Sequence, residues 1–218
     1  MADNDSRAGA RYADPDILAW TDARHAGLDP ALARAFEAPG NEDMPAIQVG
    51  RSEGRLLHLL MRLVGARKVI EVGTLAGFSA VHLARGLAPD GHLWTLEFEP
   101  KHARVARANL AAAGLSDRVT VVEGDAVATL PTLEPLGPFD AVFIDADKGR
   151  YDAYGEWAAA NLRRGGLLLA DNAYFFGKLL DPARAEAAAV RRLHEQVGAH
   201  FDSVCIPTPD GLLLGIRR

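Results

Sequence analysis

The sequence predicts an α/β protein built on a doubly wound, mostly parallel sheet. Five short apolar runs alternate with helix-length segments, which is the pattern of consecutive βαβ units. Each run is apolar on both sides, as expected of a strand that helices cover on both faces. The five runs occupy residues 69–72, 93–96, 119–122, 141–144 and 167–170.

The end of the chain predicts an antiparallel hairpin. Residues 201–206 and 212–216 form two further strands around the turn Thr208-Pro209-Asp210-Gly211. That turn is short enough to pair the two strands antiparallel to one another. A long alanine-rich helix, residues 182–197, precedes them. The sheet then has seven strands.

The start of the chain predicts a helical cap. Residues 14–36 are typical of short helices, and a break at Pro39-Gly40 and Pro45 precedes a helix with apolar residues at helical spacing over 56–64. We therefore expect a flexible N-terminus and helical cap over residues 1–45 and a main domain over residues 46–218. At 218 residues the whole is expected to be a single domain.

Composition restricts the partners and the location. The chain is 49% hydrophobic with a formal net charge of -5, which argues against nucleic acid as a partner. Its single cysteine, Cys205, excludes an internal disulfide. The polar residues 1–11 lack the apolar region of a signal peptide, and no apolar run approaches the ~20 residues of a membrane span. We expect a cytoplasmic protein that neither binds nor crosses a membrane.

Acidic residues at strand ends predict a site for an adenosine-containing ligand. Glu71 leads into the turn with Gly73, Glu97 ends the second strand, and Asp125 follows the third. Carboxyl ends of parallel strands share one edge of a sheet, where ligands bind, and Glu97 could accept hydrogen bonds from both ribose hydroxyls. The G-x-G-x-x-G fingerprint of dinucleotide-binding proteins is absent. This pattern alone leaves NAD and S-adenosylmethionine as alternatives.

The fourth and fifth strands end in residues that could bind a cation and perform chemistry. Asp145 follows one strand, and Asp171 and Asn172 follow the other. They offer only oxygen ligands, which suit Mg²⁺. Lys148 lies one turn from Asp145, and a lysine beside a cation can act as a general base. The alternatives are polar turns at the strand ends and a surface ion pair between Asp147 and Lys148.

Together these motifs resemble the metal-dependent O-methyltransferase family that contains catechol and caffeoyl-CoA O-methyltransferases. The resemblance covers residues 48–217. It rests on six ordered segments, namely residues 48–54, 71–79, 95–97, 124–126, 143–148 and 170–172.

The resemblance implies the fold, the reaction and the site. The fold is the Rossmann-like methyltransferase fold with a reversed last strand, and residues 46–218 form the methyltransferase domain. The reaction is S-adenosylmethionine- and divalent-metal-dependent methylation of a hydroxyl on a small aromatic acceptor, either catechol-like or hydroxycinnamoyl-like. A homodimer is common in the family. The cofactor-binding residues are Val49, Glu71, Gly73, Ser79, Glu97, Asp125, Ala126 and Asp145, the metal ligands are Asp145, Asp171 and Asn172, and the catalytic residues are Lys148 and Asp145.

Some alternatives stay open at this point. Tyr174, Phe175 and Phe176 occupy the place of an acceptor-pocket wall, but adjacent aromatics also occur in cores and oligomer interfaces. The other function classes are an NAD-dependent oxidoreductase, which the missing fingerprint disfavours, and a non-catalytic S-adenosylmethionine-binding protein. Such a scaffold would not need Asp145, Lys148, Asp171 and Asn172.

The seven histidines show no paired ligand spacing. They are interpreted as surface or satisfied residues, that is, residues exposed to solvent or hydrogen-bonded within the protein.

Overall fold

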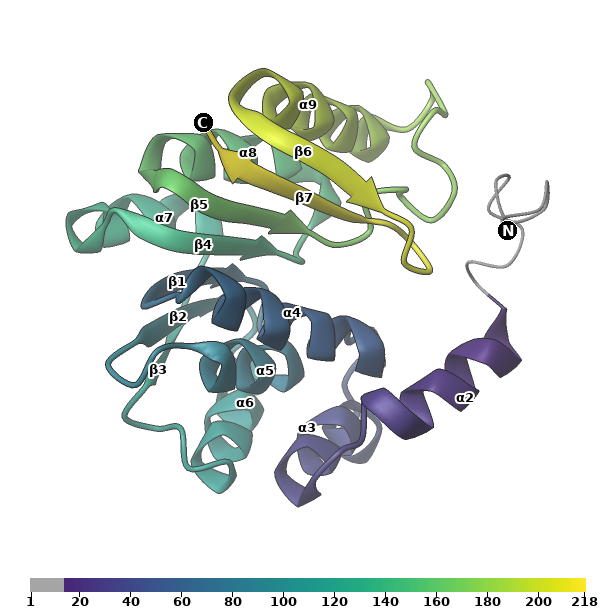
Figure 1. Cartoon of the computed structure of the whole chain (residues 1–218), viewed down its shortest axis with the longest axis vertical. Coiled ribbons are helices and arrows are strands. Elements are labelled where there is room, and N and C mark those ends of the chain that lie inside the picture. The colour runs from purple at the N-terminus through teal and green to yellow at the C-terminus, as the bar shows by residue number, and fades with distance from the viewer. Residues whose placement is uncertain (1–13) are drawn as a thin grey trace.

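The computed structural model describes residues 14–218 and contains a seven-stranded sheet of order β3-β2-β1-β4-β5-β7-β6 (Figure 1). Strands β1 to β5 run parallel, and β7 runs antiparallel to both β5 and β6. The predicted fold class, with its C-terminal hairpin, is confirmed. The strands are β1 (Lys68–Val72), β2 (His92–Glu97), β3 (Val119–Glu123), β4 (Phe139–Ile144), β5 (Leu162–Ala170), β6 (Phe201–Ile206) and β7 (Leu212–Arg217).

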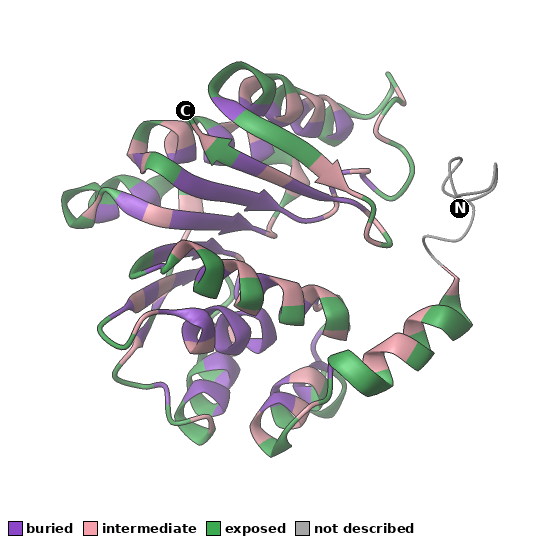
Figure 2. Cartoon of the chain, in the orientation of Figure 1, coloured by how far each residue is buried: buried purple, intermediate pink, exposed green. Residues whose placement is uncertain are grey.

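Helices cover both faces of the sheet because neighbouring strand residues point to opposite sides. Val69 and Phe143 belong to the apolar core shared with α4 (Arg51–Val64), α5 (Phe78–Gly86) and α6 (Pro100–Ala112). Ile70 and Val142 belong to the core shared with α7 (Ala126–Leu133), α8 (Tyr151–Asn161) and α9 (Ala185–His200). Figure 2 shows the result, in which the central strands are largely buried and the outer sides of the helices are exposed.

The expected helical cap consists of α2 (Pro15–His25) and α3 (Pro30–Asn41). Each begins with a proline after an aspartate, and the carboxylates of Asp14 and Asp29 accept hydrogen bonds from the first free backbone amides. Leu32 and Ala35 of α3 join the same apolar core as α4 and α5, whereas α2 has no buried residue. The expected flexible segment, residues 1–11, lies outside the described residues.

The predicted break at Pro39-Gly40 is wrong, because α3 continues through both residues to Asn41. A proline in a helix removes one backbone hydrogen bond and disturbs the turn before it. Here Pro39 lies in the last turn and is itself buried beside Ala35 and Ala38, so packing offsets that loss. The chain leaves the helical conformation only after Asn41, and the break that contains Pro45 is present.

Two predicted boundaries also move. Strand β5 begins at Leu162, five residues before the predicted start at residue 167, because Leu162 pairs with Phe139 before a register shift. Helix α9 begins at Ala185 and not at residue 182, after a turn in which Asp181 accepts a hydrogen bond from the Ala183 amide at 2.9 Å.

The carboxyl ends of the parallel strands are joined to one another by backbone hydrogen bonds. The amide of Asp145 donates to the Val72 carbonyl at 2.8 Å, and that of Asp171 donates to the Ile144 carbonyl at 3.0 Å. The strand-end acids are therefore fixed along one edge of the sheet. Among residues 14–218, none of the helices combines the length and apolar character needed to span a membrane.

Candidate active site

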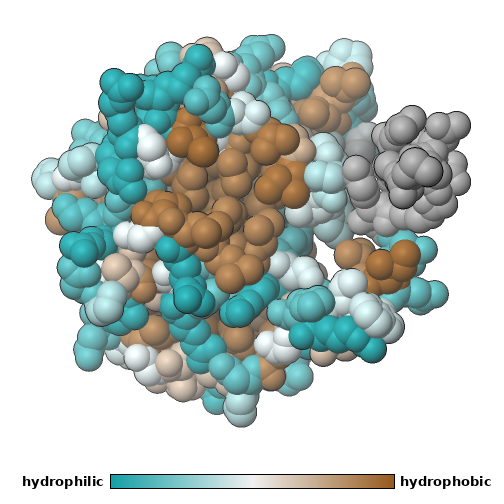
Figure 3. Space-filling view, viewed as in Figure 1, coloured by the Kyte–Doolittle hydropathy of each residue, from teal (hydrophilic) through white to brown (hydrophobic). Residues whose placement is uncertain are grey.

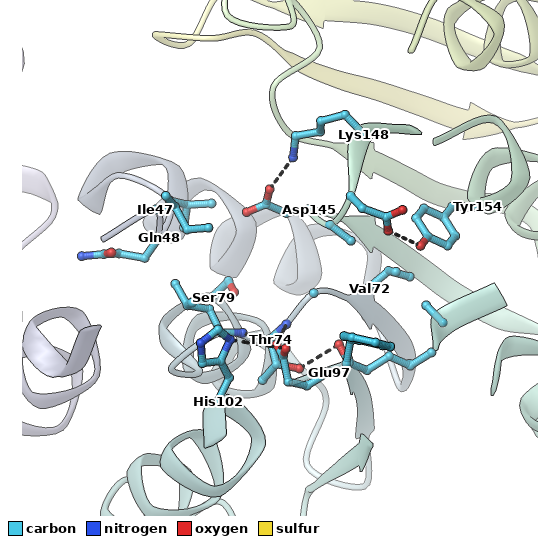
Figure 4. A pocket seen from close by; sticks show the side chains of 18 of the residues that line it. Ile47, Gln48, Val72, Thr74, Ser79, Glu97, His102, Asp145, Lys148 and Tyr154 are labelled. Atoms are coloured by element: carbon cyan, nitrogen blue, oxygen red, sulfur yellow. Dashed lines mark hydrogen bonds and ion pairs between the residues drawn. The ribbon is translucent and has the colours of Figure 1, made fainter. Parts of the chain in front are cut away.

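A cavity of about 740 Å³ opens at this edge of the sheet, a size usual for a small-molecule site. Its wall contains most of the residues that the sequence singled out, but Glu71 and Asp171 lie behind the wall. The predicted residues that line it are Val49, Gly73, Ser79, Glu97, Asp125, Ala126, Asp145, Lys148 and Asn172. Figure 4 shows Lys148 and Asp145 together on one side of the cavity and Glu97 with His102 on the other.

Glu97 is held in a fixed position on the side of the cavity opposite Lys148, which we call the cofactor side. One carboxylate oxygen, Oε2, accepts hydrogen bonds from the amides of Thr74 and Leu75 at 3.2 and 2.8 Å. The other, Oε1, accepts from the Glu99 amide at 2.9 Å and lies 3.5 Å from His102 Nδ1. The carboxylate ties the ends of β1 and β2 together, and it still faces the cavity.

Gly73 allows the ends of β1 and β4 to approach each other closely. Its φ of +98° lies in the region that glycine adopts readily, and a Cβ at this position would clash with the carbonyl oxygen of Asp145. Only glycine therefore permits this arrangement without a shift of the backbone that carries Asp145.

Glu71 is fully buried beneath the turn. Its Oε2 accepts a hydrogen bond from the Thr95 hydroxyl at 2.5 Å, while Oε1 is buried without a hydrogen-bond partner. Burial raises the pKa of Glu71 to about 8, against the lowering effect of hydrogen bonds from Ser79 and Thr95. An unpaired buried oxygen beside the cavity wall suits a site that a polar ligand completes.

The start of α7 forms a further part of the wall. Asp125 is the N-cap of α7, and its Oδ1 accepts from the Val127 amide at 2.9 Å. Its Oδ2 pairs with Arg150, which also lies 3.4 Å from Asp147. Ala126 therefore lines the cavity at a helix start that the Asp125–Arg150 pair holds in place.

Lys148 and Asp145 lie on the side of the cavity that we call the chemical side. The Lys148 Nζ lies 3.0 Å from Asp145 Oδ1 and donates a hydrogen bond to the Tyr151 hydroxyl at 2.7 Å. The Tyr151 hydroxyl in turn donates to the Asp171 carbonyl at 3.1 Å. Burial raises the pKa of Tyr151, and the charge of Asp145 adds a smaller effect in the same direction. The phenol therefore stays protonated. The alternative of an Asp147–Lys148 ion pair does not fit, since Lys148 pairs with Asp145.

Asp171 lies close enough to Asp145 for their charges to interact. Burial raises the pKa of Asp171 to about 7, and the charge of Asp145 adds to the effect. Asn172, which follows it, faces the cavity with a left-handed φ of +51°. Two carboxyl groups and an amide oxygen thus come from adjacent strand ends.

Comparison with known proteins decides between the adenosine-binding families. The model of the O-methyltransferase family matches residues 25–218, most of the chain. The chain belongs to the O-methyltransferase family.

Individual relatives agree with this family. The chain is 46% identical to a catechol O-methyltransferase of Mycobacterium tuberculosis, over 94% of this chain and 96% of the relative. It is 41% identical to a catechol O-methyltransferase of Niastella koreensis, over 87% and 91% of the two chains. The crystal structure of an O-methyltransferase from Streptomyces achromogenes in complex with SAM superposes with a TM-score of 0.87 at 35% identity, covering 95% of this chain and 97% of that one. This O-methyltransferase therefore uses S-adenosylmethionine, and the alternatives of an NAD-dependent oxidoreductase and of a non-catalytic binding protein are not favoured.

The residues of this O-methyltransferase fit a hard divalent cation by their chemistry. Within residues 14–218, no group of three or more His, Cys, Asp or Glu side chains is arranged to hold a metal ion. The predicted set contains only two carboxylates, and its third donor is the Asn172 amide. Two interacting carboxyl groups, one of them buried, favour a nearby cation, and oxygen donors suit Mg²⁺.

Sequence reasoning missed several residues of this methyltransferase site. Tyr151 follows Lys148 by one helical turn, a spacing that could have indicated their contact. The Tyr154 hydroxyl donates to Asp147 Oδ1 at 2.6 Å, and Tyr154 lines the cavity. His102, one of the histidines interpreted as surface or satisfied residues, has Glu97 as a partner at 3.5 Å and also lines the cavity, a place that the sequence did not predict. No local motif predicts that placement, because the fold alone brings the start of α6 to the cavity.

Proposed function

We propose that this methyltransferase methylates one hydroxyl of a small catechol-like acceptor with the help of a divalent cation, Mg²⁺. One observation carries the proposal: Lys148 and Asp145 form an ion pair inside the cavity, beside Asn172. Asp145, Asp171 and Asn172 would hold the cation. When bound, a divalent cation would supply Lewis-acid chemistry, which makes an acceptor hydroxyl more acidic and fixes its position.

S-adenosylmethionine, when bound, supplies an electrophilic methyl group on a positively charged sulfur. The cavity residues position the acceptor against it. Lys148 carries a proton in its ion pair with Asp145 and acts as the base once that proton has passed to solvent, when its amine accepts the proton of the hydroxyl to be methylated. The oxygen then forms a bond to the methyl carbon while the carbon–sulfur bond breaks, and the electron pair of the broken bond stays on sulfur. Asp145 and Tyr151 hold the lysine that now carries the proton, which fixes its geometry for each turnover.

The charges around the cavity favour a small uncharged acceptor over a hydroxycinnamoyl-CoA thioester. Among the described residues that line the cavity, the basic side chains are Lys148, Arg150 and His102. Each has a carboxylate beside it: Asp145, Asp125 and Glu97 respectively. Coenzyme A carries several phosphates, which are normally bound by free arginine or lysine side chains. The catechol O-methyltransferase names of two relatives support the same choice.

Phe176 supports an aromatic acceptor. It lines the cavity and is 61% exposed, whereas the adjacent Phe175 is only 7% exposed and packs in the core. Tyr174 packs against Gly211 at the β6–β7 turn. The three adjacent aromatics therefore divide their roles, and we assign Phe176 as one wall of the acceptor pocket, where its ring can contact a flat aromatic ring.

The experiment that tests the function measures methyl transfer from S-adenosylmethionine to a panel of catechols and hydroxycinnamoyl-CoA thioesters. We expect turnover with catechols, loss of turnover in excess EDTA, and recovery when Mg²⁺ is added back. Thioesters should react poorly. Equal turnover in EDTA would contradict the metal, and a preference for thioesters would contradict the acceptor.

We also propose a homodimer, as the family resemblance implies. On the α4 side of the sheet, an apolar face is formed by Leu59 and Leu63 of α4, Val204 of β6 and Ile216 of β7, all at least 40% exposed. Figure 3 shows a broad hydrophobic area where these elements face the viewer. A second copy can cover it, since a two-fold axis pairs the same apolar face of both chains.

We further propose a cytoplasmic location, which the free thiol of Cys205 supports.

A further inference from the structure

The loop that follows β5 carries both a proposed metal ligand and the proposed acceptor wall. Asn172 is its second residue, and Phe176 lies four residues further along. The arrowheads of β4 and β5 point to the edge of the sheet at which the β6–β7 turn also lies (Figure 1). The position of this loop therefore decides the shape of the chemical side of the cavity.

The backbone of this loop adopts an unfavourable conformation. Phe175 and Phe176 have φ angles of +50° and +53°, in the left-handed region that bulky residues avoid. This conformation is unfavourable for a residue with a bulky side chain, and it persists only where contacts from outside the segment hold it. Those contacts must come from a neighbouring part of the fold.

The β6–β7 turn supplies these contacts. The Phe176 amide donates to both carboxylate oxygens of Asp210, at 2.9 and 3.1 Å. The Tyr174 amide donates to the Asp210 carbonyl at 2.9 Å, and the Ala173 amide donates to the Gly211 carbonyl at 2.9 Å. Three of four consecutive amides in the loop thus end on two residues of the turn.

Gly211 lets the turn come this close. Its φ is +77°, and a Cβ there would lie 2.7 Å from the Tyr174 ring. Within the turn, the Gly211 amide donates to the Thr208 carbonyl at 3.2 Å, which closes the turn itself. Asp210 is therefore presented to the loop from a closed turn.

We infer that Asp210 is a positioning residue for the acceptor pocket. Its carboxylate holds the Phe176 amide, and through it the Phe176 ring, in the position that receives the acceptor. A hydrogen bond to a charged acceptor is stronger than a neutral one, which suits a backbone conformation that needs support. The inference rests on the proposed function, because it assigns Phe176 to the acceptor wall.

The first test compares Asp210→Ala with Asp210→Asn in steady-state kinetics with catechol. In Asp210→Ala we expect the KM for catechol to rise about tenfold, with kcat changed little and the Kd for S-adenosylmethionine unchanged. The Asn variant keeps one oxygen that can accept the Phe176 amide, so it should recover most of the affinity. Asp202→Ala is the matched control: its carboxylate lies on the same hairpin, and its ion-pair partner among residues 14–218 is Arg218, at 3.8 Å.

The second test asks whether Asp210 acts through Phe176. Phe176→Ala should raise the KM for catechol to a similar extent, and the double variant should be no worse than either single variant. Additive effects would mean that Asp210 acts elsewhere and would overturn the inference. Phe176→Ala leaves the turn intact, so it remains informative if Asp210→Ala folds poorly, and an unchanged KM in this variant would also overturn the inference.

The third test does not depend on turnover. Hydrogen exchange of the Phe176 amide, measured by NMR, should be slow in the wild type and much faster in Asp210→Ala, but nearly unchanged in Asp202→Ala. If the wild type methylates no catechol, the proposed acceptor fails while this measurement still tests the contact. If the wild type is active and both KM and exchange are unchanged in Asp210→Ala, the positioning role is refuted.

Discussion

Lys148 has two partners that keep its amine in the cavity, Asp145 at 3.0 Å and the Tyr151 hydroxyl at 2.7 Å. If the amine takes the proton of the acceptor, Lys148→Met should lower kcat by about 10²- to 10⁴-fold, the usual contribution of general-base catalysis. The affinity for S-adenosylmethionine should stay within about twofold of the wild type, since the cofactor side of the cavity is untouched. Steady-state assays measure kcat, and isothermal titration calorimetry measures the affinity for S-adenosylmethionine.

Lys101→Met is the control for that substitution. Lys101 donates a hydrogen bond to the Asp43 carbonyl at 3.1 Å and does not line the cavity. Its removal should leave kcat unchanged. A wild-type kcat in Lys148→Met would remove the lysine from the mechanism.

Because Glu71 is buried with a raised pKa, we expect the unfolding free energy of the ligand-free protein to depend on pH. Its pKa is about 8 in the folded chain, against 4.5 for an ordinary glutamate, so the folded chain keeps a proton that the unfolded chain releases. This contribution to stability is complete below pH 4.5 and is lost as the pH rises through 8. Glu71→Gln should therefore gain unfolding free energy relative to the wild type between pH 5 and pH 9, as measured by urea denaturation. A constant difference across that range would contradict the buried, protonated carboxyl.

At the scale of elements, the packing of α4 against α5 places a neutral histidine in the core. His82 of α5 lies with its ring centroid 4.9 Å from that of Phe78, against Gly54 of α4. Burial, and next the charge of His58, lower the pKa of His82 to about 4. The sequence predicts a surface or hydrogen-bonded histidine here, and this is wrong for His82, because its Nε2 is buried without a hydrogen-bond partner among the described residues.

This histidine should make the protein less stable in acid. The unfolded chain binds a proton with a pKa of 6.5, but the folded chain does so only near 4, so unfolding free energy falls as the pH drops through this window. We expect a loss of about 1–2 kcal/mol between pH 7 and pH 5 that is missing in His82→Leu. Denaturation of both proteins at each pH measures it. Parallel stability curves for the two proteins would show that His82 does not titrate in this way.

At the scale of the whole molecule, the two faces of the sheet are covered unequally. On one side, Val197 of α9 shares an apolar core with Phe201 of β6, while on the other side Val204 is 57% exposed and Leu63 is 82% exposed. Figure 2 shows β6 as a mostly exposed strand. Because α3 shares the core of α4 and α5, we propose that the cap and the methyltransferase domain form one folding unit, with the apolar face left for a second copy.

The dimer can be tested by one charge on that face. Sedimentation velocity of the wild type should give the mass of two 23.3-kDa chains, and Val204→Lys should give one, because a buried lysine without a partner opposes association. Leu136→Lys, at an exposed leucine of the short helix η1 (Glu134–Leu136) outside the face, is the matched control and should remain a dimer. A monomeric wild type, or a dimeric Val204→Lys, would rule out this interface.

The sequence alone determined the order of the strands in the chain, the hairpin and the strand-end acids, because apolar periodicity and turn residues act over short distances. Residues 201–206 form β6 with the predicted bounds, and Glu97, Asp145 and Lys148 line the cavity. Tertiary structure alone decided that Pro39 stays helical, that Glu71 and Asp171 lie behind the cavity wall, and that Asp210 holds Phe176. Each of these depends on contacts between residues distant in the chain, and packing at such contacts outweighs the local preferences that a sequence displays.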